Sequence, residues 1–204
     1  MTEARAPLNI GYETDNCIVR ELEVTDPLDV ICGWMARPEI AHGLNTPAKP
    51  LDIDELRKFV ASRNRVDSHA LGVFDRASGK LVGMWTVYVD WSRREYLLNV
   101  LLAEKISGAQ GGWRETGRPL YAIMFDDLGM ETLVYNVVAS NEEIIGRLPS
   151  TPVRVSDVPA ASGGTAKIQN YRLTRQEYFE IRSRRAERDA EFDRKREERR
   201  RLQA

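Results

Sequence analysis

The chain has 204 residues, 42% of them hydrophobic, and its 30 Lys or Arg residues nearly balance its 31 Asp or Glu residues. This length and composition suit one large globular domain, or one domain with an appendage. No apolar run approaches the roughly 20 residues of a membrane-spanning helix, and no secretory signal follows Met1, so we expect a cytoplasmic protein with no membrane partner.

The first elements are an arm, a strand and a helix. Residues 1–16 show no clear periodicity, which predicts an extended N-terminal arm. Residues 17–24 alternate apolar and polar side chains from Val19 on, which suits a strand with one buried face. Asp26 and Pro27 are typical of a helix start, and Pro38 predicts its end or a break. The apolar face of this helix carries Leu28, Ile31 and Met35.

A second helix and three strands follow a predicted loop over residues 42–50. Asp52, with Glu55 three residues later, resembles a capping box that opens the helix. Short turns then separate three apolar segments, which predicts an antiparallel meander. These strands are residues 70–74, 81–89 and 95–103.

The centre of the chain is a glycine-rich loop, residues 106–119, between the last of these strands and an amphipathic helix. Glycines allow a ligand to approach the backbone, and a helix start presents unpaired N–H groups with partial positive charge. The segment therefore suits a phosphate or pyrophosphate, although many such loops are only connections. Gly129 should end the helix. The inner face of this helix carries Leu120, Ile123, Met124 and Leu128.

The next strand is predicted at residues 132–139, and its connection through a helix makes it a parallel neighbour of residues 95–103. Asn141 can cap a short helix after it. Residues 149–164 are rich in Pro, Ser, Ala and Gly and should form an excursion between two strand pieces. Those pieces lie near residues 153–155 and 168–173.

Thr174 and Glu177 form a second capping-box pattern, which opens a charged C-terminal helix. Its apolar stripe fades after Ile181, so we expect the first two turns to dock and residues 182–204 to project as a tail. From Arg172 onward there are 12 Lys or Arg and 8 Asp or Glu residues. The interleaved acids favour a solvated helix over a nucleic-acid partner.

The cysteines and histidines argue against a disulfide framework and a metal site. Cys17 and Cys32 lie in apolar contexts, which predicts buried, reduced thiols. His42 and His69 are far apart, and neither spacing resembles that of metal ligands. We therefore expect no metal.

The order of these elements resembles the GNAT N-acetyltransferase superfamily, and in detail its ribosomal-protein N-terminal acetyltransferase branch. The likeness is carried by residues 14–22, by Val138-Ala139-Ser140-Asn141 and by residues 170–178. It covers about residues 14–180. It implies an α+β fold for residues 17–181, with a mixed, mostly antiparallel sheet and helices on both faces.

The resemblance also implies acetyl-CoA as co-substrate. The family motif Gln/Arg-x-x-Gly-x-Gly/Ala matches Arg114-Glu115-Thr116-Gly117-Arg118, but Pro119 replaces the last residue and lacks an N–H donor. The two arginines could compensate with guanidinium charge. The pantetheine arm is expected between the two parallel strands. There it would meet the backbone of Val100, Leu101 and Leu102 and the amide of Asn141.

Acetyl transfer to an amine also needs a base and a proton donor for the leaving thiolate. Glu95 and Glu104 flank the strand before the loop and are the base candidates, although both also suit ordinary exposed strand-end carboxylates. Ile144 occupies the position where the family often has Ser or Ala. Tyr135 is the candidate donor, with Ser140 and Tyr171 as alternatives.

The sequence thus predicts an acyl-CoA-dependent N-acetyltransferase that works in a ternary complex. The alternative is a GNAT-shaped binding or regulatory module, or an enzyme for another acyl donor. The sequence allows several acceptor amines: a protein N-terminus, or a small molecule such as a polyamine, an antibiotic or a metabolite. A homodimer is also left open.

Overall fold

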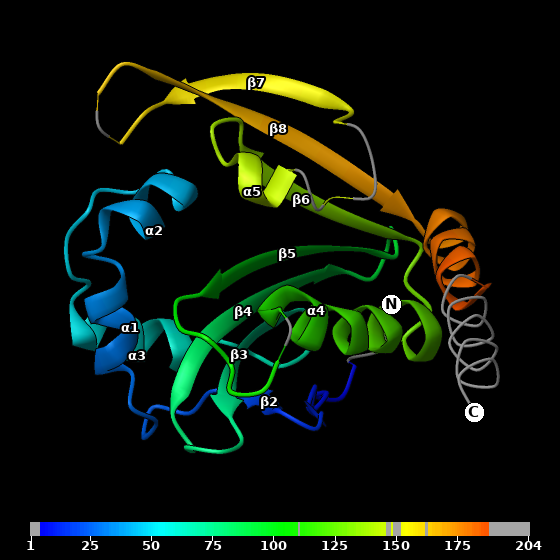
Figure 1. Ribbon diagram of the computed structural model, residues 1–204, viewed down its shortest axis with the longest axis horizontal. Coiled ribbons are helices and arrows are strands. Elements are labelled where there is room, and N and C mark those ends of the chain that lie inside the picture. Colours follow the sequence, from blue (N-terminus) through cyan, green and yellow to red (C-terminus); the bar gives the residue numbers. More distant parts are fainter. Residues whose placement is uncertain (1–4, 110, 146–147, 149–151, 162, 188–204) are drawn as a thin grey trace, which may run out of the picture.

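The computed structural model describes residues 5–109, 111–145, 148, 152–161 and 163–187. Eight strands form one sheet in the order β1-β2-β3-β4-β5-β6-β8-β7 (Figure 1). The strands are β1 (Tyr12–Glu13), β2 (Cys17–Glu21), β3 (Ser68–Asp75), β4 (Leu81–Asp90), β5 (Glu95–Leu102), β6 (Thr132–Val138), β7 (Arg154–Pro159) and β8 (Thr165–Thr174). The helices are α1 (Asp29–Trp34), α2 (Pro38–Leu44), α3 (Ile53–Ala61), α4 (Gly112–Ala122), the π-helical turn η1 (Ile123–Asp127), α5 (Glu142–Ile145) and a C-terminal helix described over residues 175–187.

All neighbouring strands run antiparallel except β5 and β6. The chain passes from β5 to β6 through α4 and η1, so the predicted helical crossover and parallel pairing are confirmed. The predicted α+β fold with a mostly antiparallel sheet is also confirmed. β1 lies within the segment that the sequence indicated as an arm, and it pairs with β2 at the edge of the sheet.

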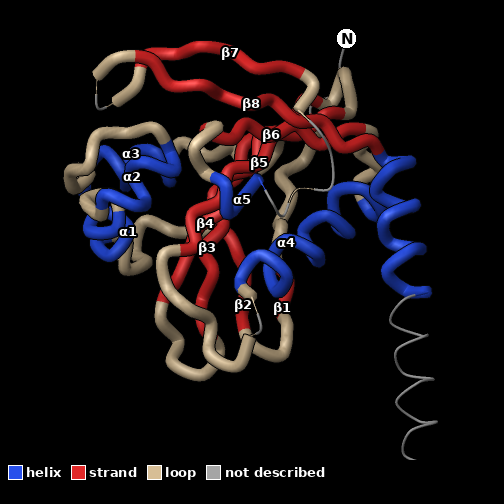
Figure 2. The backbone as a smooth tube through the Cα atoms, turned by 45° about the horizontal axis from the view of Figure 1, so that its top comes forward, coloured by secondary structure: helices blue, strands red, loops and turns tan. Residues whose placement is uncertain are grey.

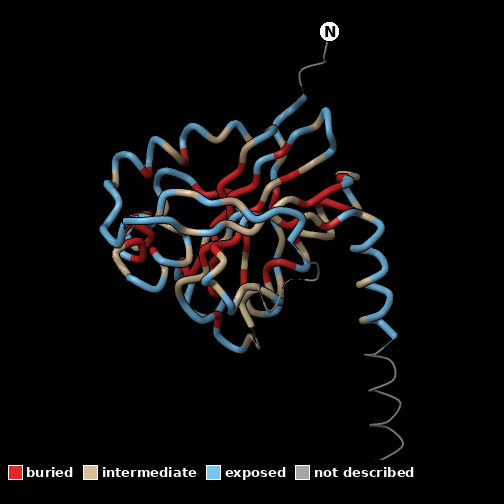
Figure 3. The backbone as a smooth tube through the Cα atoms, turned by 90° about the horizontal axis from the view of Figure 1, so that it is seen from above, coloured by how far each residue is buried: buried red, intermediate tan, exposed pale blue. Residues whose placement is uncertain are grey.

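Side chains alternate across the sheet and build one core on each face. On one face Trp85 and Val87 of β4 pack with Leu120 of α4. On the other face Leu101 of β5 packs in a cluster with residues of α1 and α3, among them Ile31 and Leu56, and the neighbouring Met84 of β4 packs against that cluster. Figure 2 shows α1, α2 and α3 on one side of the strands and α4 on the other. The buried segments concentrate in the central strands (Figure 3).

The C-terminal helix docks beside η1 through its first turns. Tyr178 stacks on Phe125 with ring centroids 4.6 Å apart, and Ile181 packs against the same core. Arg182 pairs with Asp126 at 2.5 Å. The expected docking of the first turns is therefore confirmed. The expectation of a projecting tail concerns residues that mostly lie outside the described part of the chain.

The two helix caps predicted for α1 and α3 differ in outcome. Asp52 caps α3 as predicted, because its carboxylate accepts the N–H groups of Asp54 and Glu55. Asp26 does not cap α1, which begins only at Asp29. Its carboxylate accepts instead from the Glu23 N–H at 2.8 Å and pairs with Arg20.

The predicted loop over residues 42–50 was wrong at its start, because α2 extends to Leu44. Pro38 is the first residue of α2. Proline fits the first helical position, where its missing N–H would have no partner within the helix. Asn45 in the left-handed conformation (φ 51°) then ends α2.

The start of the central helix was also predicted wrongly. α4 begins at Gly112, so residues 113–118 are helical and Pro119 lies inside the helix rather than at its start. Thr116 and Gly117 are buried in its second turn. This packing against the sheet stabilises a helical turn that the local preference of Pro119 opposes.

Gly83 is expected to be essential for the contact between β4 and β5. A Cβ atom at this position would lie 2.7 Å from the backbone oxygen of Leu101 and 2.6 Å from a methyl group of Leu102. Gly83→Ala should therefore cost about 1–3 kcal/mol, the usual range for overpacking. That corresponds to a fall in melting temperature of several degrees, at roughly 2–4 °C per kcal/mol.

Gly33→Ala is the matched control. A Cβ atom on Gly33 in α1 meets nothing within 4 Å, and alanine lowers the entropy of the unfolded chain. We expect an unchanged or higher melting temperature in calorimetry. Equal melting temperatures for the two variants would contradict the assignment of close strand packing to Gly83.

Candidate functional site

The two parallel strands part after three residues. Residues Glu95–Leu97 of β5 pair with Thr132–Val134 of β6, and the pairing ends there. Beyond this point β5 stays paired with β4 as far as Leu102, whereas β6 stays paired with β8 as far as Val138. Each strand follows its other neighbour, so the sheet opens between them at their carboxyl ends. This is the opening that the resemblance implied.

A cavity of about 350 Å³ occupies this opening. Its walls come from the diverging strands and from α4, α2 and the short helix α5. Leu98–Leu102 of β5 line one side, and Tyr135–Val137 of β6 line the other. Trp113 and Tyr121 of α4 close it on one face of the sheet. We call this space the strand cavity.

Helix α2 lies over the end of β6 and borders the strand cavity. The His42 Nε2 and Ser140 Oγ atoms are 2.9 Å apart and share a hydrogen bond. Asn45 donates to the Pro159 carbonyl and accepts from the Ala161 N–H, both at 3.0 Å. These contacts connect α2 to the strand end and to the β7–β8 hairpin. They place Glu39 of α2 in the cavity wall.

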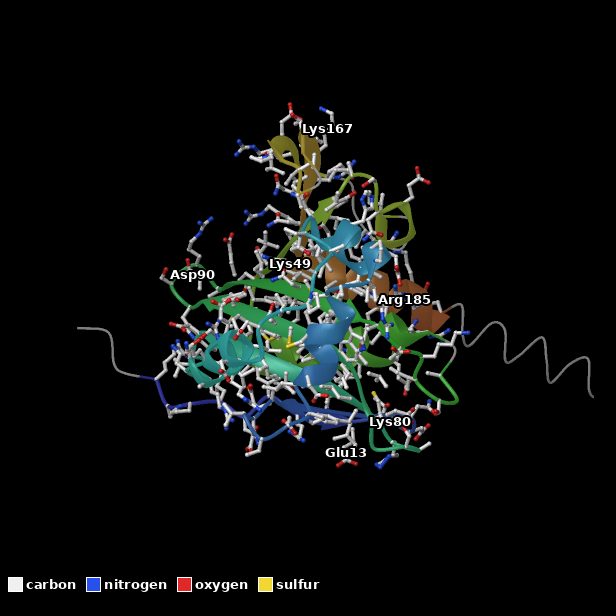
Figure 4. The ribbon with its side chains drawn as sticks, turned by 90° about the vertical axis from the view of Figure 1, so that its left-hand side faces the viewer. Glu13, Lys49, Lys80, Asp90, Lys167 and Arg185 are labelled. Carbon is white, nitrogen blue, oxygen red and sulfur yellow. The ribbon has the colours of Figure 1, made fainter. Side chains whose placement is uncertain are left out.

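A second hollow, which we call the arginine groove, lies between α4 and the C-terminal helix and measures about 850 Å³. Arg114 and Arg118 of α4 face it from one side, and Arg182 and Arg185 from the other (Figure 4 labels Arg185). Gly111, at the start of α4, also borders it. The groove therefore combines guanidinium groups with the positive end of a helix, and both favour an anion.

The strand cavity and the arginine groove share Trp113 and Tyr121 as lining residues. The two rings contact each other edge to face, with centroids 6.3 Å apart, and Trp113 also packs on Trp85. Burial raises the pKa of Tyr121 well above its usual value, so its hydroxyl stays neutral. An elongated molecule could thus extend from the groove into the cavity past uncharged aromatic rings.

Asp75 holds the loop that leads to α4. Its carboxylate accepts the Ser107 N–H at 2.7 Å, and the Ser78 hydroxyl at 2.6 Å and N–H at 2.9 Å. The hydrogen bonds from Ser78 and then Ser107 lower the pKa of Asp75 to about 2. A charged, fully bonded carboxylate therefore connects the β3–β4 turn to the approach of the helix.

Several predicted site residues meet in the strand cavity. Val100, Leu101, Leu102, Tyr135 and Asn141 all line it. The Asn141 side-chain oxygen accepts the Ile144 N–H at 3.3 Å, so its predicted capping role is confirmed. Its Nδ2 atom points toward Gly43 of α2, 3.1 Å from where a Cβ atom would stand.

The predicted phosphate motif divides between three environments. Arg114 and Arg118 face the arginine groove. Glu115 is held on another side, where its carboxylate accepts from Thr14 Oγ1 at 2.5 Å and from Asn16 Nδ2 at 3.2 Å. Thr116 and Gly117 are buried; the Thr116 hydroxyl bonds to the Gly112 carbonyl at 2.8 Å, and Gly117 faces Trp85 and Trp113.

The two predicted bases lie away from the strand cavity. Glu95 stands at the paired end of β5, in contact with Arg172 and 3.1 Å from Arg93. Glu104 follows β5 and pairs with Arg37 at 2.5 Å. Neither is among the residues that line the cavity, and their role in catalysis stays a prediction.

Sequence reasoning did not select Trp113, Tyr121 or Glu39. The two aromatic residues recur at a spacing of eight, which is close to two helical turns and would place them on one helix face. That signal becomes visible only when the helix is known to begin at Gly112. Glu39 carries no local signal, because its position depends on how α2 packs against a strand about 100 residues later.

Comparison with known proteins identifies the fold. A GNAT-family acetyltransferase from Bacillus anthracis superposes with a TM-score of 0.64 at 10% identity, over 82% of this chain and all of the other. The spermidine N-acetyltransferase of Vibrio cholerae, solved with CoA and spermine, gives 0.68 at 15% identity, over 81% of this chain and 99% of the other. The chain has the GNAT acetyltransferase fold.

A third match is a candidate ribosomal-protein-serine acetyltransferase of Vibrio cholerae, with a TM-score of 0.61 at 15% identity over 81% of this chain and 97% of the other. Because polyamine and ribosomal-protein enzymes match similarly, the comparison selects no branch. No protein-family model and no curated protein sequence matches the chain. Within the described residues, no helix is long and apolar enough to cross a membrane, and no group of His, Cys, Asp or Glu is arranged for a metal ion.

Asp75 should make the stability of the protein depend on pH in acid. Its pKa is about 2 in the folded chain and about 3.9 in an unfolded one. Its contribution is therefore complete above pH about 5 and is lost as the pH falls through the folded-state pKa of about 2. Asp75→Asn should be less stable than the parent at pH 6 and should lose less stability between pH 4 and pH 2.

Urea unfolding at a series of pH values measures this difference. The control is Asp54→Asn, because Asp54 is an exposed carboxylate on α3. Its stability should follow the parent closely at every pH. A pH dependence of Asp75→Asn parallel to that of the parent would contradict the role assigned to this carboxylate.

Proposed function

We propose that this protein is an acyl-CoA-dependent N-acyltransferase that moves an acetyl group from acetyl-CoA to a primary amine. The observation that carries the proposal is that the strand cavity and the arginine groove adjoin each other at Trp113 and Tyr121, which line both. Acetyl-CoA has a long uncharged arm that ends in a thioester and a nucleotide that carries a diphosphate and a further phosphate. The mostly uncharged cavity suits the arm, and the arginines of the groove suit the phosphates, with Arg182 already paired to Asp126.

The open edge of β5 would hold and activate the thioester. Past Leu97 this edge has no strand partner on the β6 side within the described sheet, so backbone N–H and C=O groups there are available to the arm. A backbone N–H fixed in this way polarises the thioester carbonyl and stabilises the oxyanion that forms on attack. The Asn141 amide, at the far wall of the cavity, would add a hydrogen bond to the arm.

The reaction requires both substrates together. The neutral amine nitrogen attacks the thioester carbon, a C–N bond forms and the C–S bond breaks. The amine loses its extra proton to a base, and the CoA thiolate leaves and takes up a proton. Tyr135 borders the strand cavity and is the proposed donor of that proton.

Glu39 is the proposed proton acceptor. Glu39 is the one carboxylate among the described residues that line the strand cavity. Glu95 and Glu104 lie elsewhere. A base must lie within hydrogen-bond reach of the proton it removes, directly or through one water. Position therefore favours Glu39 over the two acids that the sequence indicated.

The three glutamates can be compared directly. Glu39→Gln should lower kcat by about 100-fold, the lower end of general-base effects, while CoA affinity stays within twofold. Glu95→Gln and Glu104→Gln should keep kcat within a few-fold of the parent. Steady-state release of free thiol measures the rates, and a large loss in Glu104→Gln with none in Glu39→Gln would reverse the assignment.

The arginine groove is tested by a matched pair of neighbours on the C-terminal helix. Arg185 lines the groove, whereas the exposed Arg184 does not. A charge-assisted hydrogen bond contributes about 1.5–3 kcal/mol, so Arg185→Glu should weaken CoA binding at least about tenfold. Arg184→Glu, with the same change in net charge, should bind CoA within about twofold of the parent.

Calorimetry with CoA and acetyl-CoA measures both variants and the parent. Equal weakening by the two variants would show a general charge effect and would remove the groove from the site. CoA binding without acyl transfer to any amine would instead favour a GNAT-shaped binding module. That alternative has one observation in its favour, because Ile144 borders the cavity where relatives often have Ser or Ala.

A further inference from the structure

A third cavity, of about 330 Å³, lies on the opposite face of the sheet from α4. Helices α1 and α3 cover it, and β4 and β5 form its floor. Met84 and Thr86 of β4 and Asn99 and Leu101 of β5 supply that floor. We call it the acceptor cavity.

The acceptor cavity meets the strand cavity at the edge of β5. Asn99, Val100 and Leu101 line both spaces, and Leu44 at the end of α2 borders both as well. Trp85 and Leu98 border only the strand cavity, whereas Met84 and Thr86 border only the acceptor cavity, as expected for side chains that alternate across a sheet. Because β6 has left this edge, two molecules can approach it from the two faces.

The walls of the acceptor cavity are almost entirely apolar. They consist of aliphatic, thioether and aromatic side chains: Ile31, Met35, Leu56, Phe59 and Met84. The polar groups on the floor already bond to each other, since the Asn99 amide donates to the Thr86 hydroxyl at 3.0 Å. A ligand with several charges along its length would lose its hydration there without partners, which is costly. The cavity therefore suits an uncharged, apolar body.

The mouth of the cavity is acidic. Asp52, the N-cap of α3, and Glu55, in its first turn, both line it and are both exposed; the Asp52 carboxylate also accepts the N–H groups of Asp54 and Glu55. Leu44 and Leu51 lie beside them with 36% and 39% of their surface exposed. Negative charge beside exposed apolar side chains attracts an amphiphilic cation and opposes a carboxylate.

We propose that the acceptor cavity binds the body of the acceptor, which is a primary monoamine with a single apolar group and no carboxylate. The inference rests on the proposed acyl transfer and specifies its second substrate. The volume lies at the lower end of the roughly 300–1,000 Å³ of ligand pockets and exceeds the roughly 150 Å³ that holds a benzene ring, so it accommodates an aromatic ring or a branched alkyl group. The amine then reaches the thioester at the shared edge of β5.

Four acceptors distinguish this assignment from the alternatives. They are 2-phenylethylamine, phenylalanine, spermidine and a short peptide with an N-terminal serine, each assayed with acetyl-CoA by thiol release. We expect kcat/KM for 2-phenylethylamine to exceed each of the others at least about tenfold. Preference for spermidine, phenylalanine or the peptide, with normal CoA binding, would overturn this inference and leave acyl transfer in place.

CoA binding is measured separately by calorimetry, and so is binding of 2-phenylethylamine to the protein without CoA. Absence of CoA binding would overturn the proposed function and this inference with it. Turnover of 2-phenylethylamine at the level of spermidine would overturn the inference alone. Saturable binding of 2-phenylethylamine but not of phenylalanine supports it independently of turnover.

A pair of variants tests the acidic mouth. Glu55→Lys should lower kcat/KM for 2-phenylethylamine about fivefold, as expected for a partly screened charge, and should narrow the preference over phenylalanine. Asp54→Lys changes the same charge in the same helical turn, but Asp54 does not line the cavity. It should match the parent, and the KM for acetyl-CoA should be unchanged in both. Equal effects of the two variants would overturn the assignment of the mouth.

Discussion

The early end of the pairing between β5 and β6 is the constraint on which the rest of the site depends. Three residue pairs hold the strands together, and beyond them each strand continues with its outer neighbour. A sheet normally satisfies its backbone groups by pairing, so an open inner edge is unusual in a buried region. Here each strand keeps its outer pairing, and the aromatic side chains of α4 line the gap between them. Past Leu97 the backbone N–H and C=O groups of β5 that face β6 have no strand partner within the described sheet, so they are available as hydrogen-bond donors and acceptors.

Helix α4 connects the opening to the charged part of the surface. Its first residues border the arginine groove, while Trp113 and Tyr121 face both hollows. The approach to this helix is anchored by Asp75, and its first turn by the contacts of Glu115 with Thr14 and Asn16. These bonds connect the helix to β2, β3 and the turns beside them. The position of the positive helix end therefore depends on the whole first half of the sheet.

The two cores explain how two different substrates can reach one strand. α4 and the C-terminal helix cover one face, and α1 and α3 cover the other (Figures 1 and 2). The strand cavity and the acceptor cavity both border β5. The arginine groove shares Trp113 and Tyr121 with the first, and carboxylates border the second. The opposite charges of the two entrances would separate the proposed anionic donor from the proposed cationic acceptor. This arrangement follows from strand alternation together with the loss of β6 from the edge.

The sequence by itself determined the elements whose signals are local. The alternation in β2, the Asp52 cap of α3, the helical crossover to β6 and the Asn141 cap all depend on residues close together in the chain. The tertiary structure decided the start of α4, where packing of Thr116 and Gly117 on the sheet overrides the preference of Pro119. It also decided which acid faces the cavity, because Glu39 reaches it only through the contact of α2 with the end of β6. Such placements arise from contacts between residues about 100 positions apart, and local patterns carry no information about them.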